Sequence, residues 1–459
     1  MPAHITRPRA LLGGLFGVLL GAASPAGDAL AQARALGDEA PGSSPAAESP
    51  ARALGDEAPG SSPAAEGPAT VKPWTAPANI KEWSNGIKLG LQIQAGITGN
   101  PTVPDRGVNF GQLTTDLPNR PLLNQVLATA GRDIDPKATG YDFGFKFALL
   151  YGSDARIYHT LGVFDRLIHD RNQLAVIEAT AAVRLPWLGN GIDVKAGIFP
   201  TPLGFEVMEP RINPFYSHSY IFNYGLPLKH TGALAVAHVS DVLDLYFGIT
   251  TGTNTFFGSA GDNNDRPAGL GGFGLVLAGG NLTVLALTHI GPDSPTRLVP
   301  FGNSALRYYN DVVVTYKASD KLSFTTEVNY VKDDGFRAEG YGAAQYVTYA
   351  LNERFTFNAR GEIWRDNGNL FVVNPNSNRD YANAQRGDYA TLITSPRAGT
   401  YFELTLGVAY KPAGLTGPLS TLLVRPEIRY DRTLNGARPF NGGRNAQQFT
   451  VGADLVLGF

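Results

Sequence analysis

Two carboxylates stand three positions apart in a segment that is otherwise apolar and aromatic. Glu206 and Glu209 follow Pro200 and precede Pro210. A carboxylate pair can serve general acid–base catalysis or hold a divalent cation. We favour the interpretation that both glutamates are polar residues of a pore loop. The chain also contains no Gly-x-Ser-x-Gly motif of the kind that presents a nucleophilic serine.

Three further patterns could bind an ion or a phosphate group. The run Gly261–Asp265 offers oxygen ligands but lacks the full ligand spacing of a calcium loop. His218 and His230 flank one segment and could share a metal, although the chain has no cysteine to complete a thiolate site. The Gly-rich run 269–274 opens a predicted strand and no helix follows, which disfavours phosphate binding. We therefore expect neither a metal nor a cofactor.

The elements that must position these residues are short runs in which apolar and polar residues alternate. Alternation of this kind predicts strands with one apolar and one polar face. Sixteen such runs follow Ser84: Gly86–Thr98, Tyr141–Tyr151, Ala155–Phe164, Gln173–Arg184, Gly191–Phe199, Lys229–Val239, Val242–Thr251, Leu270–Ala278, Asn281–Ile290, Leu306–Lys317, Lys321–Val331, Tyr341–Ala350, Arg354–Trp364, Thr400–Tyr410, Thr421–Asp431 and Phe449–Phe459.

The connections between these runs alternate between tight turns and long polar loops, such as 252–269, 291–305, 332–340, 365–399 and 432–448. Short turns on one rim and long loops on the other are typical of outer-membrane barrels. We assign residues 99–140 to one long first loop, within which Pro121–Arg132 is apolar enough to pack on or in the wall. The sequence thus predicts an all-β, transmembrane, antiparallel up-and-down barrel of about sixteen strands.

The last run and the N-terminus support export to a membrane. Eleven residues from Phe449 suffice to cross a bilayer as a tilted strand, and a final Phe459 resembles the end of bacterial outer-membrane barrels. Arg7 and Arg9 precede a short apolar run and a small-x-small site at 31–33, the pattern of a cleaved signal peptide. A strand of a soluble sandwich could also show the final alternation, but the leader and the turns favour a barrel.

The chain therefore divides into a signal peptide (1–33), a disordered tether (34–83) and a barrel (84–459). The tether is predicted from a sixteen-residue unit rich in Pro, Ala, Gly and Ser that occurs at 33–48 and again at 51–66. The formal net charge is -2, so nucleic-acid binding has no electrostatic support.

Charged residues recur on the polar face of the predicted strands. The lumen of a barrel of this size is too wide for side chains to fill and would hold water, so we expect these charges to be solvated and to line a pore. They are Lys88, Glu178, Arg184, Lys195, Glu327, Arg360, Glu362, Glu403, Arg425, Glu427, Arg429 and Asp454. Basic and acidic residues are nearly balanced along this face, which predicts weak charge selectivity.

The loop 200–228 is expected to fold inward and narrow the pore. It is rich in aromatic residues, and a loop extended into water would expose a large apolar surface. Its five prolines also reduce the entropy lost on ordering. The residues expected at the constriction are Glu206, Glu209, Arg211, Tyr216, His218 and Tyr220.

Four motifs stand out along the predicted barrel: Gly140–Ala155, Val194–Glu206, Asn213–Tyr220 and His230–Gly232. In combination they resemble the β-barrel porin-2, OmpL-like family, and the resemblance covers essentially the whole chain after the tether. The resemblance implies a porin of the bacterial outer membrane but does not fix its solute. We expect passive diffusion of small hydrophilic solutes or ions, and we do not expect an enzyme because no catalytic motif is present in the sequence. The partners of the porin would be outer-membrane lipid, the solutes and further copies in a homo-oligomer. The alternatives are a barrel enzyme and a structural or adhesive barrel acting through its extracellular loops.

Overall fold

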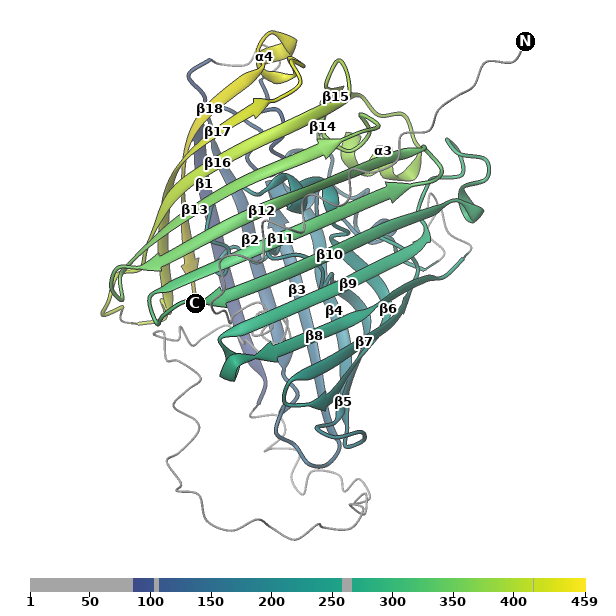
Figure 1. Ribbon diagram of the computed structural model, residues 1–459, viewed down its shortest axis with the longest axis vertical. Helices are drawn as coiled ribbons and strands as arrows, with labels where there is room; N and C mark the ends of the chain where they lie inside the picture. Colours follow the sequence, from purple (N-terminus) through teal and green to yellow (C-terminus); the bar gives the residue numbers. More distant parts are fainter. Residues whose placement is uncertain (1–85, 103–106, 258–265, 416) are drawn as a thin grey trace, which may run out of the picture.

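Hydrogen bonds between the first and last strands close one antiparallel sheet into a barrel (Figure 1). The structure is a computed structural model that describes residues 86–102, 107–257, 266–415 and 417–459. The predicted signal peptide, the predicted tether and the run Gly261–Asp265 lie outside these ranges. Within them, sixteen strands form the barrel, so the predicted fold class is confirmed.

Each barrel strand pairs with the barrel strands that precede and follow it along the chain. Strand β13 pairs with β16, because β14 and β15 form a separate two-stranded sheet. The barrel strands are β1 (Lys88–Gly99), β2 (Pro121–Arg132), β3 (Asp142–Gly152), β4 (Gln173–Leu185), β5 (Ile192–Pro200), β6 (Lys229–Ser240), β7 (Leu243–Thr250), β8 (Ala268–Leu277), β9 (Leu282–Pro292), β10 (Leu306–Lys317), β11 (Leu322–Asp333), β12 (Ala338–Ala350), β13 (Phe355–Asp366), β16 (Gly399–Tyr410), β17 (Thr421–Thr433) and β18 (Gln447–Gly458).

The remaining elements are short and belong to the connections. They are η2 (Ser153–Arg156), the single π-turn η3 (Ile221–Gly225), η4 (Ala278–Gly280), η5 (Gly302–Ser304), the paired strands β14 (Val373–Pro375) and β15 (Leu392–Thr394), α3 (Asp380–Arg386) and α4 (Phe440–Gly443). In Figure 1, α3 and α4 lie at one rim and the C-terminus lies at the other. No helix of the described residues is long and apolar enough to cross a membrane.

The last strand shows why the alternating pattern yields this fold. On β18, Phe449 and Val451 are 42% and 47% exposed on the outer face, whereas Thr450 and Asp454 are buried on the inner face. The Phe459 backbone N–H donates to the Leu91 carbonyl at 2.8 Å, which extends the pairing that closes the barrel. Closure matters because an open sheet edge would leave backbone groups unpaired in lipid.

One predicted loop segment is a strand. Pro121–Arg132 forms β2 and pairs with both β1 and β3, so the assignment of 99–140 to a single loop is wrong. The pairing with β1 shifts register between Gln94 and Ala95, and both Asn124 and Gln125 are buried. A bulge of this kind breaks the two-residue period, which hides the strand from an analysis of alternation.

One predicted strand is a loop segment. Ala155–Phe164 begins in η2 and continues through the connection between β3 and β4, and its residues from Ala155 to Leu161 are all buried instead of alternating. The Asp154 carboxylate accepts hydrogen bonds from Asn124 Nδ2 at 2.9 Å and Gln125 Nε2 at 3.1 Å. These bonds hold the chain against β2, so it cannot continue as a wall strand.

The predicted count of sixteen strands was therefore right because these two errors cancel. The predicted alternation of connection lengths is also observed. Tight turns such as 241–242 lie at one rim, and long connections such as 153–172, 201–228 and 367–398 lie at the other. The prediction of a long loop at 332–340 is wrong, because only residues 334–337 separate β11 from β12.

A glycine in β5 should be required for the wall. Gly197 has φ +134°, and a Cβ added there would lie 2.0 Å from the Ala179 carbonyl oxygen. We expect Gly197→Ala to lower the free energy of unfolding by about 2 kcal/mol or more, measured by urea unfolding in detergent micelles. Gly361→Ala in β13 is the matched control because a Cβ there meets nothing within 4 Å. Equal stability of the two variants would contradict the requirement for glycine at position 197.

Candidate functional site

The loop 201–228, which joins β5 to β6, crosses the lumen and is held by carboxylates of the opposite wall. The Phe205 backbone N–H donates to Glu327 Oε1 at 3.0 Å. The Tyr216 N–H donates to Glu427 Oε2 at 2.8 Å, and the Tyr220 N–H donates to Glu362 Oε2 at 2.6 Å. A loop without regular structure leaves such donors unpaired, and here strands β11, β13 and β17 supply the acceptors.

Arginines of the same wall satisfy the carbonyl groups of the loop. Arg425 Nη1 donates to the Asn213 carbonyl at 2.6 Å. Arg429 Nη1 donates to the His218 carbonyl at 2.6 Å. Charge-assisted bonds of this kind are about twice as strong as neutral ones, so the loop is fixed in position along most of its length.

Ion pairs complete this contact between the loop and the wall. Arg360 Nη1 lies 2.6 Å from Glu206 Oε1, and Arg360 Nε lies 3.0 Å from Glu403 Oε2. His218 Nδ1 lies 2.7 Å from the second oxygen of Glu206. Wall residues also pair among themselves, with Arg425 Nη2 2.5 Å from Asp454 Oδ2. Pairing of this kind offsets part of the cost of removing the charges from water.

The aromatic side chains of the loop are buried against the same groups. Phe215, Tyr220 and Phe222 are at most 3% exposed. The Arg360 guanidinium lies 5.0 Å from the Phe215 ring centroid, and that of Arg429 lies 5.5 Å from the Tyr220 ring centroid. The prediction that the loop folds inward is therefore confirmed.

This packing changes the role of most charges that the sequence placed on the inner face. Eight of them lie on the inner face, are at most 6% exposed and bond to the loop or to each other beneath it, so the expectation that they are solvated is wrong: Glu327, Arg360, Glu362, Glu403, Arg425, Glu427, Arg429 and Asp454. The same expectation is wrong for Glu178 and Arg184, which are 4% and 3% exposed. Lys88 lies apart from them at the rim of tight turns, where its side chain is 52% exposed and its Nζ is 3.6 Å from Asp133 Oδ2.

Space remains on the other side of the loop, along β3 to β6. A cavity of about 900 Å³ opens near the tight turns, and its lining includes Glu178, Arg184 and Lys195 among the predicted residues. Arg184 Nη1 lies 2.8 Å from Asp193 Oδ1. The described lumen thus has a half sealed by the loop, at β11 to β18, and an open half, at β3 to β6.

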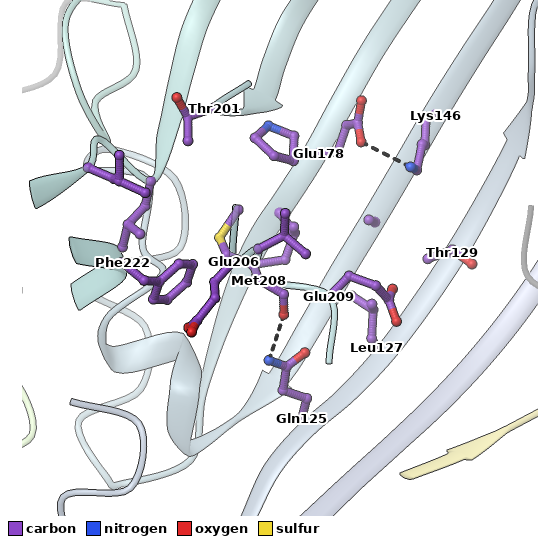
Figure 2. A pocket seen from close by; sticks show the side chains of 16 residues that line it. Gln125, Leu127, Thr129, Lys146, Glu178, Thr201, Glu206, Met208, Glu209 and Phe222 are labelled. Atoms are coloured by element: carbon purple, nitrogen blue, oxygen red, sulfur yellow. Dashed lines mark hydrogen bonds and ion pairs between the residues drawn. The ribbon is translucent and has the colours of Figure 1, made fainter. Parts of the chain in front are cut away.

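At its inner end the cavity meets a narrow pocket of about 70 Å³. Lys146, Glu178, Pro200 and Thr201 line both spaces. Figure 2 shows Lys146 facing Glu178 at one edge of this pocket, with Nζ 3.4 Å from Oε2. The loop contributes the facing wall, which includes Met208 and Phe222.

The residues considered for catalysis or metal binding have other partners. Glu209 Oε1 lies 2.8 Å from Arg211 Nε, so the carboxylates of Glu206 and Glu209 are held by different cations. The His218 ring stacks on Phe222, whereas the His230 ring packs 4.5 Å from that of His289. Among the described residues, no group of three or more His, Asp or Glu side chains could hold a metal.

The sequence analysis missed how the long loops pack together over the opposite rim. Asn374 Nδ2 donates to the Gln112 carbonyl at 2.6 Å, and the Gly111 N–H donates to Asn374 Oδ1 at 2.8 Å. Arg386 pairs with Asp165 across two further loops. These residues stand in polar stretches without periodicity, which gives no signal for their contacts.

Comparisons with known proteins agree with this geometry. A family model described as putative beta-barrel porin-2, OmpL-like, matches residues 86–459. The outer membrane channel DcaP of Acinetobacter baumannii is similar in structure, with a TM-score of 0.50, 11% identity, and coverage of 81% of this chain and 97% of that chain. The high-pH structure of Pseudomonas putida OprB is similar with a TM-score of 0.50 and 14% identity, and the match covers 83% of this chain and 96% of that chain. No curated protein matches the chain.

Ionisation of Glu206 should stabilise the folded protein. Burial alone raises its pKa, but the Arg360 guanidinium, His218 and the Ser219 N–H lower the pKa of Glu206 from 4.5 to about 2. A carboxyl whose pKa is lowered by folding adds stability above pH 4.5 that is lost as the pH falls to about 2.

We expect Glu206→Gln to be less stable than the wild type by about 3 kcal/mol at pH 7, with the difference disappearing between pH 4.5 and about 2. Urea unfolding in detergent across this range measures it. Glu353→Gln, in the exposed turn before β13, is the control and should show no such dependence. A difference that stays constant with pH would contradict the assignment of Glu206.

Proposed function

Because this chain belongs to the family described as putative beta-barrel porin-2, OmpL-like, it is an outer-membrane porin, and we propose that its solutes pass through the open half of the lumen. The observation that carries the proposal is the position of loop 201–228. The loop is bonded to β11, β13 and β17, whereas the cavity of about 900 Å³ lies along β3 to β6.

The chemistry of the two halves supports this route. In the sealed half, Arg360, Glu403 and Arg429 are at most 1% exposed, so a solute would have to break buried ion pairs to pass. In the open half, Lys195 and Thr201 are only partly buried and line the cavity, and hydrated solutes can exchange water for these polar groups. Small hydrophilic solutes and ions are the class that such a lining accepts.

The narrow pocket would be the constriction on this route. A volume of about 70 Å³ holds roughly five water-sized probes, so the described conformation admits only small groups there. Outside the barrel, outer-membrane lipid would contact the exposed apolar side chains of the wall, such as Leu89, Phe247 and Leu404.

Removing the loop tests whether it narrows the channel. We expect replacement of residues 206–224 by a short Gly-Ser linker to raise the single-channel conductance in planar bilayers severalfold, because the lumen would lose its filling. Heat-modifiable mobility on gels shows whether the variant has folded. Unchanged conductance in a folded variant would place the loop outside the conducting path.

Two matched truncations test which half conducts. Phe222 lines the narrow pocket, whereas Phe215 is buried in the sealed half beside Arg360. We expect Phe222→Ala to raise the conductance and Phe215→Ala to leave it unchanged. The reverse result would place the route in the sealed half. A folded wild-type barrel that stays electrically silent would favour an enzyme or an adhesive barrel instead.

A further inference from the structure

Lys195 of β5, at the inner end of the open half, makes no ion pair with a described carboxylate. Lys146 pairs with Glu178 and Arg184 pairs with Asp193. Within the described residues, no carboxylate pairs with the ammonium group of Lys195 and nothing accepts a hydrogen bond from it; its contact is with the Phe199 ring, whose centroid lies 5.2 Å from Nζ. Lys195 lines the cavity of about 900 Å³, so its charge faces the space that solutes enter.

The carboxylates near this lysine are already neutralised. The Glu178 carboxylate pairs with Lys146, whose Nζ lies 3.4 Å from Glu178 Oε2. At the narrow pocket, Glu206 contacts Arg360 and Glu209 contacts Arg211. Pairing therefore leaves an excess positive charge at the inner end of the cavity, where low-dielectric walls make a charge act more strongly than in water.

Beyond this charge the narrow pocket is mainly apolar. Its apolar lining includes Leu127, Ile177, Met208, Phe222, Leu226 and Leu228. Strand register places Lys146 opposite Thr180 and Lys195 opposite Ala182, so the two lysines stand on either side of β4, two residues apart along it. A ligand that suits both features has an anionic head and a small apolar body.

We propose that this junction is a binding site for small organic carboxylates. The carboxylate contacts the Lys195 ammonium group beside Lys146, and the apolar body enters the pocket formed by Met208, Phe222 and their neighbours. The inference rests on the proposed function, because the ligand reaches the site through the open half of the lumen. It adds a preferred class of solute to a channel that would otherwise discriminate by size.

Butyrate and its neutral analogue butyramide test the proposal with the full-length protein, because a short alkyl chain suits a pocket of about 70 Å³. In planar bilayers at about 0.1 M KCl, where screening is moderate, we expect butyrate to reduce the current in a saturable way and butyramide to have little effect. Lys195→Gln should raise the half-blocking concentration of butyrate roughly tenfold, the effect of losing one charge-assisted hydrogen bond. Lys195→Arg should retain the block.

Lys321→Gln is the matched control, because Lys321 is an exposed lysine in the turn before β11, outside the cavity lining. Equal block by butyramide, or butyrate block that survives Lys195→Gln, would overturn the site while leaving the porin function intact. A silent bilayer would instead count against the porin function. In that case, calorimetric titration of the same variants with butyrate in detergent tests the binding site directly. Loss of butyrate binding in Lys195→Gln, with binding kept in Lys321→Gln, would support the site, and equal binding by both variants would overturn it.

Discussion

A closed sheet of sixteen strands encloses a lumen wider than its own side chains can fill, and the rest of this structure depends on how that space is occupied. The loop 201–228 fills one side, but it brings unpaired backbone N–H and carbonyl groups with it. Those groups need partners. Glu362 and Glu427 accept from the N–H groups, and Arg425 and Arg429 donate to the carbonyls, so the wall charges and the loop require one another.

The buried ion pairs are better understood as positioning than as net stabilisation. Desolvation of two charges offsets much of their attraction, whereas removal of one partner leaves the other unpaired at a cost of about 3–5 kcal/mol. Arg360 lies between Glu206 of the loop and Glu403 of the wall, and this arrangement selects one location for the loop. Because the loop is held at β11 to β18, the space at β3 to β6 stays open.

Much of the barrel could be predicted from the sequence, because alternation directly reports which face of a strand is apolar. The prediction failed where a local feature broke that period, as at the bulge beside Asn124 and Gln125, and where Asp154 holds an alternating segment as a loop. The aromatic content of 201–228 was enough to predict its inward fold. The identity of its partners was not predictable, since a pattern that places Arg360 and Glu427 on the inner face does not say what covers them.

The same limit applies to charge. A count along the inner face gives nearly equal numbers of basic and acidic residues and therefore weak selectivity, but the count treats every charge as equally exposed to a solute. In the folded protein the charges of β13 to β18 are paired and buried beneath the loop, so they contribute little field to the open half. There, Arg184 and Asp193 largely cancel one another. At the inner end of the cavity the remaining field depends strongly on Lys195, because the nearby Glu178 carboxylate already pairs with Lys146.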